Sequence, residues 1–469
     1  MDQPDFKPAF ATTLEAAAAL REKRISAREL LALTYQRIDR HNPALNAIVW
    51  QDRERAMVCA TQADKARAAG TASGALHGVP VTIKESFAYR GSPSTWGVPP
   101  LKDAPSPRTA VAVERLESAG AIVVGKTNVP VMLADWQSDN PVYGTTNNPW
   151  DTTRTPGGST GGGAAALAAG FGCLTLGSDL SGSIRIPAHF CGVYGHKPTL
   201  ELINTAGLQP GPWDGSPTAP MDLSVVGPLA RGARDLALAL EAMGGPAGAG
   251  AIAWTWRLPR PRHTRLRDFR IGYVMDDTRA PVSSDVASVY ERVLMELCRT
   301  GAVMECGWPE GIDLDGQVKT YQFLLFAFLN AVGREEPARP ETHWRWMQET
   351  LRTLAFRAMW QKYFETHDVF LSPAGFSAAF PHDRSQPIER RVVKTPEGDR
   401  PYLSTSWWTM FATLSGLPAT VAPVGQTEAD LPVGLQIIAP MWEDATAIEF
   451  AALLSDAIGG FRPPPEFGE

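Results

Sequence analysis

The sequence predicts an α/β fold, because short apolar strands alternate along it with segments of helical periodicity. Residues 78–84 and 173–176 are apolar runs of the length that forms buried strands. Apolar residues make up 44% of the 469-residue chain, so it can bury a large core. Residues 13–40 carry apolar side chains at helical spacing, at Leu14, Ala17, Ala18, Leu30, Leu31, Leu33 and Ile38.

The N-terminal elements look like scaffold. Ser26 followed by Glu29 matches a capping box, which predicts that a second helix begins there. Residues 46–50 are predicted to form a strand, and residues 52–69 a third helix that ends at Gly70.

The next predicted strand, GVPVTIKE at residues 78–85, ends in charged residues. Burial would lower the pKa of Lys84 and leave a neutral amine that can act as a base. The alternative is a lysine at a strand end whose ammonium group extends to solvent. The residues alone leave both interpretations open.

Residues 120–127, GAIVVGKT, match the GxxxxGK[ST] pattern of a phosphate loop. In such a loop the strand precedes the first glycine, whereas here residues 121–124 are themselves strand-like. Pro130 also lies where a helix begun at Lys126 would need a backbone N–H. We therefore predict a strand and no nucleotide site.

Residues 157–199 contain two serines in glycine-rich surroundings, Ser159 and Ser183. A predicted helix at 164–169 and the strand at 173–176 separate them. The strand ends in GSDLSGS, a turn whose N–H groups could bind an anion. A serine beside such donors is a candidate nucleophile for acyl transfer, because that reaction develops an oxyanion. A glycine-rich turn between packed elements is the structural alternative.

Residues 157–161 also match the GxSxG nucleophile elbow of α/β-hydrolases. That motif needs an apolar strand directly before it, whereas residues 149–156 are polar and turn-like. The elbow also needs a downstream histidine, and the chain has them at positions 189, 196, 263, 343, 367 and 382. Sequence context makes the elbow the weaker interpretation.

The run GGSTGG followed by GSDLSGSIRIPAHFCGVYGHKPT resembles the signature of the amidase signature family of serine hydrolases. The resemblance covers almost the whole chain and is weakest at about residues 244–400. It implies the amidase signature fold, a large mixed β-sheet covered by α-helices on both faces. Residues 1–469 would form a single domain, with a variable substrate-shaping region at about 244–400.

The resemblance also implies a catalytic triad. Ser183 would be the nucleophile, Ser159 would follow a cis peptide bond and relay the proton, and Lys84 would be the base. Met132 and Trp136 would help line the substrate pocket, with core packing as the alternative for both. No cofactor would be required. The oxyanion donors would be the backbone N–H groups of Leu180, Ser181, Gly182 and Ser183.

Several positions depart from the family pattern. Ser181 stands where many members have glycine, which would strain the turn if that position needs φ > 0. Thr160 replaces a serine whose hydroxyl supports the triad. Leu200-Glu201 replaces the usual Gly-Arg, and Thr413 replaces a usual asparagine.

Composition argues against several classes of partner. The net charge of −6 argues against nucleic acid or an anionic membrane as the main partner, and the arginine run at 257–270 is predicted to be a solvated connector. No HExxH or CxxC motif is present, so we predict no metal, and we expect His189 and His196 to be structural. Five cysteines without a CxxC pair, no export signal at the N-terminus and no apolar stretch of 18 residues predict a soluble cytoplasmic protein.

The predicted function is hydrolysis of carboxamide bonds. Eight of the 14 tryptophans lie at residues 254–408 and favour bulky hydrophobic or aryl amides, although core packing is the alternative explanation. Esters and carbamates (urethanes) fit the same triad. The remaining alternatives are the A subunit of a glutamyl-tRNA amidotransferase, which would need a partner chain, and a binding module with an inactive triad.

Overall fold

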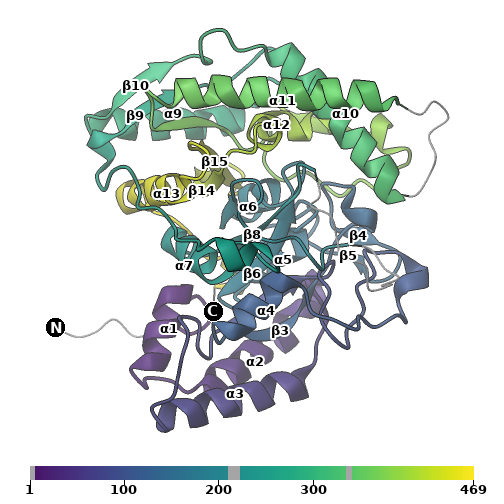
Figure 1. Ribbon diagram of the computed structural model, residues 1–469, viewed down its shortest axis with the longest axis vertical. Helices are drawn as coiled ribbons and strands as arrows, with labels where there is room; N and C mark the ends of the chain where they lie inside the picture. Colours follow the sequence, from purple (N-terminus) through teal and green to yellow (C-terminus); the bar gives the residue numbers. More distant parts are fainter. Residues whose placement is uncertain (1–5, 210–221, 334–340, 469) are drawn as a thin grey trace.

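The computed structural model is organised around a mixed sheet of 11 strands, and it describes residues 6–209, 222–333 and 341–468 (Figure 1). The strand order is β1-β3-β2-β6-β8-β7-β14-β15-β11-β9-β10. Residues 1–5, on which part of the expectation about export rests, lie outside the described residues.

The strands are β1 (Ile48–Trp50), β2 (Pro80–Lys84), β3 (Ile122–Thr127), β4 (Asp139–Asn140), β5 (Gly144–Thr145), β6 (Leu174–Asp179), β7 (Tyr194–Lys197), β8 (Val225–Ala230), β9 (Arg270–Tyr273), β10 (Val303–Cys306), β11 (Val369–Pro373), β12 (Val392–Thr395), β13 (Gly398–Pro401), β14 (Ala419–Gln426) and β15 (Pro432–Ile438).

The helices are α1 (Thr13–Arg21), α2 (Ala27–Leu45), α3 (Arg53–Ala68), α4 (Val111–Ser118), α5 (Gly161–Ala168), α6 (Arg185–Cys191), α7 (Ala233–Met243), α8 (Gly250–Ala253), α9 (Ser284–Arg299), α10 (Leu314–Gly333), α11 (His343–Tyr363), α12 (Trp407–Leu414) and α13 (Asp444–Ile458).

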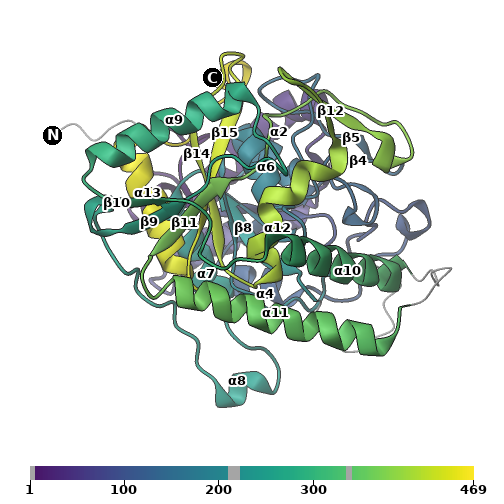
Figure 2. The same ribbon diagram turned by 90° about the horizontal axis from the view of Figure 1, so that it is seen from above.

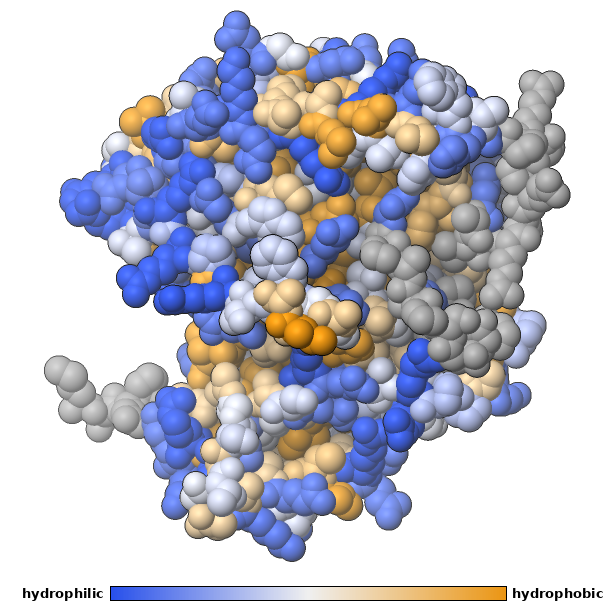
Figure 3. Space-filling view, viewed as in Figure 1, coloured by the Kyte–Doolittle hydropathy of each residue, from blue (hydrophilic) through white to orange (hydrophobic). Residues whose placement is uncertain are grey.

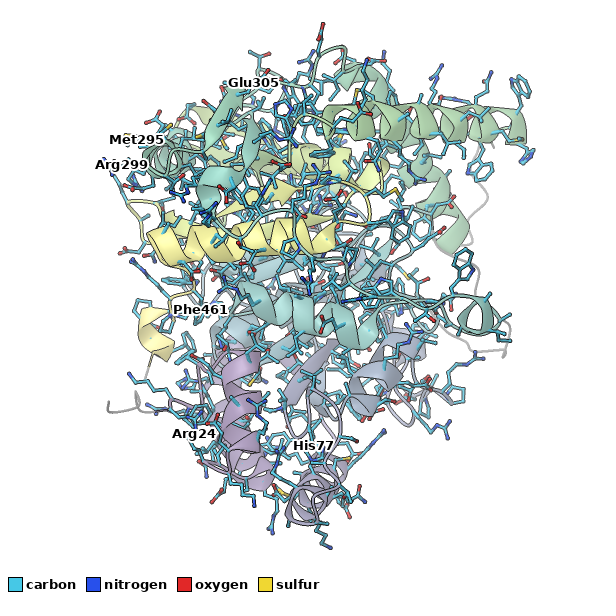
Figure 4. All side chains as sticks on the ribbon, turned by 60° about the vertical axis from the view of Figure 1, so that its left-hand side comes forward. Arg24, His77, Met295, Arg299, Glu305 and Phe461 are labelled. Carbon is cyan, nitrogen blue, oxygen red and sulfur yellow. The ribbon has the colours of Figure 1, made fainter. Side chains whose placement is uncertain are left out.

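Helices cover both faces of the sheet, as the sequence predicts. Helices α6 and α13 lie on opposite sides of β14 and β15 (Figure 2), and α5 packs against α6 and α7 against α13. The expected capping box is present, with the Ser26 hydroxyl accepting from Glu29 N–H at 3.1 Å. Helix α9 buries Val286, Val289 and Val293, whereas Met295 and Arg299 point outward (Figure 4).

Three parallel strands end at the same edge of the sheet. β2 runs parallel to β6, and β8 runs antiparallel to both β6 and β7. The carboxyl ends of β2, β6 and β7 therefore bring Lys84, Asp179 and Lys197 to one edge. In open α/β sheets this is the edge where ligands bind.

The segment that matches a phosphate loop is strand β3, which pairs in parallel with β2. Lys126 is buried within β3, and its ammonium group donates to Phe87 O at 2.9 Å, Ser92 Oγ at 3.2 Å and Ser94 Oγ at 3.0 Å. These contacts hold the loop that follows β2. The prediction of a strand is confirmed.

The arginine run is not wholly a solvated connector, because two of its members form ion pairs with a carboxylate far along the chain. Arg262 contacts Asp368 at 3.0 Å, and Arg270 contacts the same carboxylate at 2.7 Å. The prediction missed these pairs because Asp368 is about 100 residues further along the chain. Among the described residues, no helix is long and apolar enough to cross a membrane.

Helix α1 is attached to α7 through one buried carboxylate. Asp235 accepts from the N–H groups of Thr13 at 2.9 Å and Leu14 at 3.0 Å, two of the free donors at the start of α1. Burial raises the pKa of Asp235 to about 6.

We expect Asp235→Ala to destabilise the fold by about 1–3 kcal/mol, because the buried Thr13 N–H and the partly buried Leu14 N–H lose their acceptor. Urea denaturation followed by circular dichroism would measure this as a lower midpoint. The control is Asp456→Ala, which removes an exposed contact to Arg234 and should change stability by less than about 1 kcal/mol. Equal midpoints for the two variants would contradict the prediction.

Candidate active site

Lys84 is buried at the carboxyl end of β2, between β3 and β6, with 0% of its surface exposed. Its Nζ lies 2.6 Å from Ser159 Oγ, 3.0 Å from Ser178 Oγ and 3.3 Å from Ser178 O. Burial lowers the pKa of Lys84 to about 7, although the negative charge of Asp179 acts in the opposite direction. The alternative of a lysine extending to solvent is therefore wrong.

Ser159 follows a cis peptide bond after Gly158 and precedes α5. A Cβ atom at Gly158 would lie 2.5 Å from the backbone oxygen of Asp135, so only glycine fits there. Thr160 N–H donates to Ser183 O at 3.0 Å, which holds the two serine segments together. The Thr160 hydroxyl donates to Ser178 O at 3.2 Å, so threonine keeps a hydrogen bond at this position.

The turn formed by residues 180–183, hereafter the 180–183 turn, presents backbone donors beside Ser183. The left-handed residue is Gly182, with φ of 87°, so Ser181 causes no strain there. Gly182 N–H donates to Asp179 Oδ1 at 2.9 Å. Among the described residues, the N–H groups of Leu180, Ser181 and Ser183 have no acceptor, so the expected set of oxyanion donors narrows from four to these three.

A buried ion pair supports the 180–183 turn. Arg185 contacts Asp179 at 2.8 Å, and both side chains are inaccessible to solvent. Burial would raise the pKa of Asp179, but the charge and hydrogen bonds of Arg185 outweigh it and lower the pKa to about 2. Arg185 also donates to Thr409 O at 2.6 Å, Gln436 Oε1 at 2.8 Å and Thr413 Oγ1 at 2.7 Å. Thr413 thus supplies an acceptor where the family has asparagine.

The two histidines of the signature have structural partners. His189 Nδ1 accepts from Gly434 N–H at 2.6 Å, and His196 Nε2 lies 3.0 Å from Asp444 Oδ1. Residues 155–160 form no strand, so the nucleophile elbow lacks its required strand. Within the described ranges, no group of three or more His, Cys, Asp or Glu side chains is arranged to hold a metal ion.

The two expected pocket residues differ in their contacts. Trp136 Nε1 donates to Ser181 O at 2.9 Å, which places its ring against the 180–183 turn. Met132 is half-buried, and its N–H donates to Trp96 O at 2.7 Å. Sequence analysis missed Tyr321, whose hydroxyl lies 2.5 Å from Ser181 Oγ. Tyr321 belongs to the variable region and to no motif, so no local signal identifies it.

A cavity of about 430 Å³ lies at the same edge of the sheet. Its walls are residues 200–206, between β7 and β8, residues 222–224, directly before β8, and the facing sides of α10 and α11. Val225 pairs with Asp179, so the cavity adjoins the strand that carries the 180–183 turn.

Most of the tryptophans at residues 254–408 do not line this cavity. Of the eight, only Trp346 is part of its wall in the described structure. Trp308, Trp407 and Trp408 pack against one another, so core packing explains them. Trp254 is 73% exposed beside α8, where an apolar patch lies at the centre of the face in Figure 3.

Comparison with known proteins identifies the family. The sequence profile of the Amidase family matches residues 29–330 and 317–448. The chain is 34% identical to the indoleacetamide hydrolase of Bradyrhizobium diazoefficiens, over 96% of this chain and 86% of that protein. It is 33% identical to the acylamidase of Rhodococcus erythropolis, over 93% of each. A bacterial aryl acylamidase of the amidase signature family has the same fold, with a TM-score of 0.82 over 97% of each chain and 21% identity. The chain therefore belongs to the amidase signature family of amide hydrolases.

Proposed function

We propose that this protein cleaves carboxamide C–N bonds through Ser183, Ser159 and Lys84. The observation that carries the proposal is the 2.6 Å contact between Lys84 Nζ and Ser159 Oγ inside a buried site. A serine hydroxyl is a weak nucleophile until a neighbouring base takes its proton. Neutral Lys84 is that base, and it acts through the Ser159 hydroxyl.

In the acylation step, the Ser183 hydroxyl attacks the amide carbonyl carbon. Its proton passes to Ser159, and the Ser159 proton passes to Lys84. The N–H groups of Leu180, Ser181 and Ser183 stabilise the oxyanion. The proton returns through Ser159 to the amine leaving group as the C–N bond breaks. Water then hydrolyses the acyl-enzyme by the same proton path, and no cofactor takes part.

Bulky hydrophobic or aryl amides are the proposed substrates, with esters and carbamates as further candidates. The cavity of about 430 Å³ lies at the same edge of the sheet as Asp179, and its lining does not include the residues of the 180–183 turn. Its volume is within the size range of small-molecule sites, and Trp346 gives it an aromatic wall. The names of the two relatives, an acylamidase and an indoleacetamide hydrolase, agree with this substrate class.

The first test is turnover of p-nitroanilides, p-nitrophenyl esters and an aryl carbamate by the isolated protein. Ser183→Ala should lower kcat by at least about 10⁴-fold, because the nucleophile is removed. The control is Ser284→Ala at the surface end of α9, which should keep full activity. Wild-type rates in Ser183→Ala would refute the triad. A wild-type protein that turns over none of the substrates would favour the amidotransferase subunit or the binding module.

The second test is the pH dependence of kcat/KM. Because the neutral amine of Lys84 is the active form, kcat/KM should rise as the pH is raised through about 7 and then level off. Below that inflection it should fall about tenfold per pH unit.

Lys197 offers a matched control for this profile, because burial also lowers its pKa to about 7. It lies at the end of β7, which runs parallel to β2 but is separated from it by β6 and β8, and its Nζ donates to Pro198 O at 2.8 Å. Lys197→Met should keep the inflection where wild type has it. Loss of the inflection in this variant would show that Lys84 is not the titrating group.

The third test concerns the cavity. Trp346→Ala should raise KM for aryl amides by about 10-fold and leave KM for acetamide nearly unchanged, because only the aryl group fills the cavity. The control is Trp344→Ala, which removes a 70% exposed tryptophan from the same helix. Equal effects of the two variants would exclude the cavity as the aryl site.

A further inference from the structure

We propose that Tyr321 is a positioning residue that holds the oxyanion donors of the 180–183 turn through the Ser181 side chain. The inference rests on the proposed function. It assigns a role in the reaction to the variable region, which contributes none of the triad residues. It also explains why this chain has serine where many family members have glycine.

Ser181 is held by two side chains from distant parts of the sequence. Tyr321 OH lies 2.5 Å from Ser181 Oγ, and Trp136 Nε1 donates to Ser181 O at 2.9 Å. Tyr321 is 140 residues from Ser181 and Trp136 is 45 residues away. Both the side chain and the carbonyl group of Ser181 are therefore fixed.

These contacts determine where the N–H groups of the turn point. The peptide unit between Ser181 and Gly182 is planar, and both of its polar atoms are engaged. Ser181 O accepts from Trp136, and Gly182 N–H donates to Asp179 Oδ1 at 2.9 Å. The preceding peptide unit carries the free Ser181 N–H, and no comparable pair of contacts holds it. The orientation of this preceding peptide unit depends on rotation about the Ser181 N–Cα bond. The hydrogen bond from Tyr321 fixes the direction of the Ser181 Cα–Cβ bond and so restricts that rotation.

Tyr321 is itself held firmly enough to act in this way. Its side chain is 1% exposed, and burial raises its pKa above the ordinary value, so the hydroxyl keeps its proton and donates to Ser181. The neighbouring Thr320 donates to Glu349 on α11 at 2.7 Å, which ties α10 to α11 at this level.

The same face of α10 also forms a wall of the cavity. Leu324 lies one helical turn beyond Tyr321 and is part of the cavity lining. A substrate group in the cavity therefore packs on the helix that holds the 180–183 turn. Through this helix, filling the cavity and orienting the Ser181 N–H are mechanically linked.

Tyr321→Phe tests the proposal, because it removes one hydroxyl and keeps the ring. We expect kcat for a p-nitroanilide to fall roughly 10- to 100-fold with KM changed by less than about threefold, because the oxyanion exists only in the transition state. Affinity for a trifluoromethyl ketone, which forms an oxyanion on Ser183, should fall by the same factor as kcat/KM. The pH inflection should stay in place, since Lys84 is untouched.

Tyr290→Phe is the matched control, because Tyr290, like Tyr321, is a buried tyrosine with a hydrogen-bonded hydroxyl. The Tyr290 hydroxyl donates to a backbone oxygen away from the 180–183 turn, Gly434 O at 2.9 Å. This variant should lose stability and keep its kcat. Urea midpoints for both tyrosine variants separate a folding defect from a catalytic one. An equal loss of kcat in the two variants would overturn the positioning role.

A double-variant cycle gives the decisive result. Ser181→Ala should lower kcat by about the same factor as Tyr321→Phe, and the double variant should lose no more than either single variant. The inference would be refuted if the loss of kcat in the double variant were the product of the two single losses, or if Tyr321→Phe kept the wild-type kcat. The proposed function would stand in either case, provided that Ser183→Ala is inactive.

Discussion

The arrangement depends on a buried amine, that of Lys84, which among the described residues has hydroxyl groups and no carboxylate within hydrogen-bond distance. Lys84 contacts Ser159 and Ser178, and burial lowers its pKa to about 7. A carboxylate in contact with Lys84 would favour the ammonium form and remove the base. Asp179 directly follows Ser178, which contacts Lys84, so a carboxylate lies close to the amine.

Arg185 prevents that outcome. It pairs with both oxygens of Asp179, and the N–H groups of Gly182 and Ile184 donate to the same carboxylate. With its hydrogen-bonding positions occupied, Asp179 acts on Lys84 only through its residual field. The same ion pair fixes the loop that leads into α6. One buried ion pair thus fixes the 180–183 turn and keeps the Asp179 carboxylate from the Lys84 amine, and the proposed mechanism needs both effects despite the desolvation penalty of the pair.

The sequence was informative where function depends on local backbone geometry. Ser159 and Ser183 lie among glycines that the structure requires, since a Cβ at Gly158 would clash and Gly182 has positive φ. Apolar periodicity likewise located α1, α2, α3 and α5 and the strands β1, β2, β3 and β6 in the first 180 residues. It could not separate Lys84 from Lys126, because each lies at or next to the last residue of an apolar strand and both are buried. Only their partners differ, and those partners come from other segments.

Contacts between segments far apart in the sequence were not predictable, because the partner of a side chain is set by the fold and not by its neighbours in the chain. Asp235 binds Thr13 and Leu14 across more than 220 residues, and Tyr321 reaches Ser181 across 140. No spacing rule connects such positions. The tryptophans show the opposite error, because their number suggested an aromatic cleft whereas most of those at 254–408 pack in the core or lie exposed. The residue type determines which kinds of contact a side chain can make, and the topology of the fold determines which partner it meets.

The serine at position 181 shows how a change in one part of the chain depends on another. Glycine would leave this position free to rotate, which costs conformational entropy when the turn is ordered. Serine is tolerated because the left-handed position is Gly182, one residue later. Its hydroxyl then meets the Tyr321 hydroxyl, which would lack this acceptor if position 181 were glycine. The buried tyrosine at 321 and the serine at 181 thus form a pair that a glycine at 181 would break. In this chain the variable region forms a wall of the cavity and also contacts the 180–183 turn, so in the proposed mechanism substrate fit and transition-state stabilisation depend on the same helix, α10.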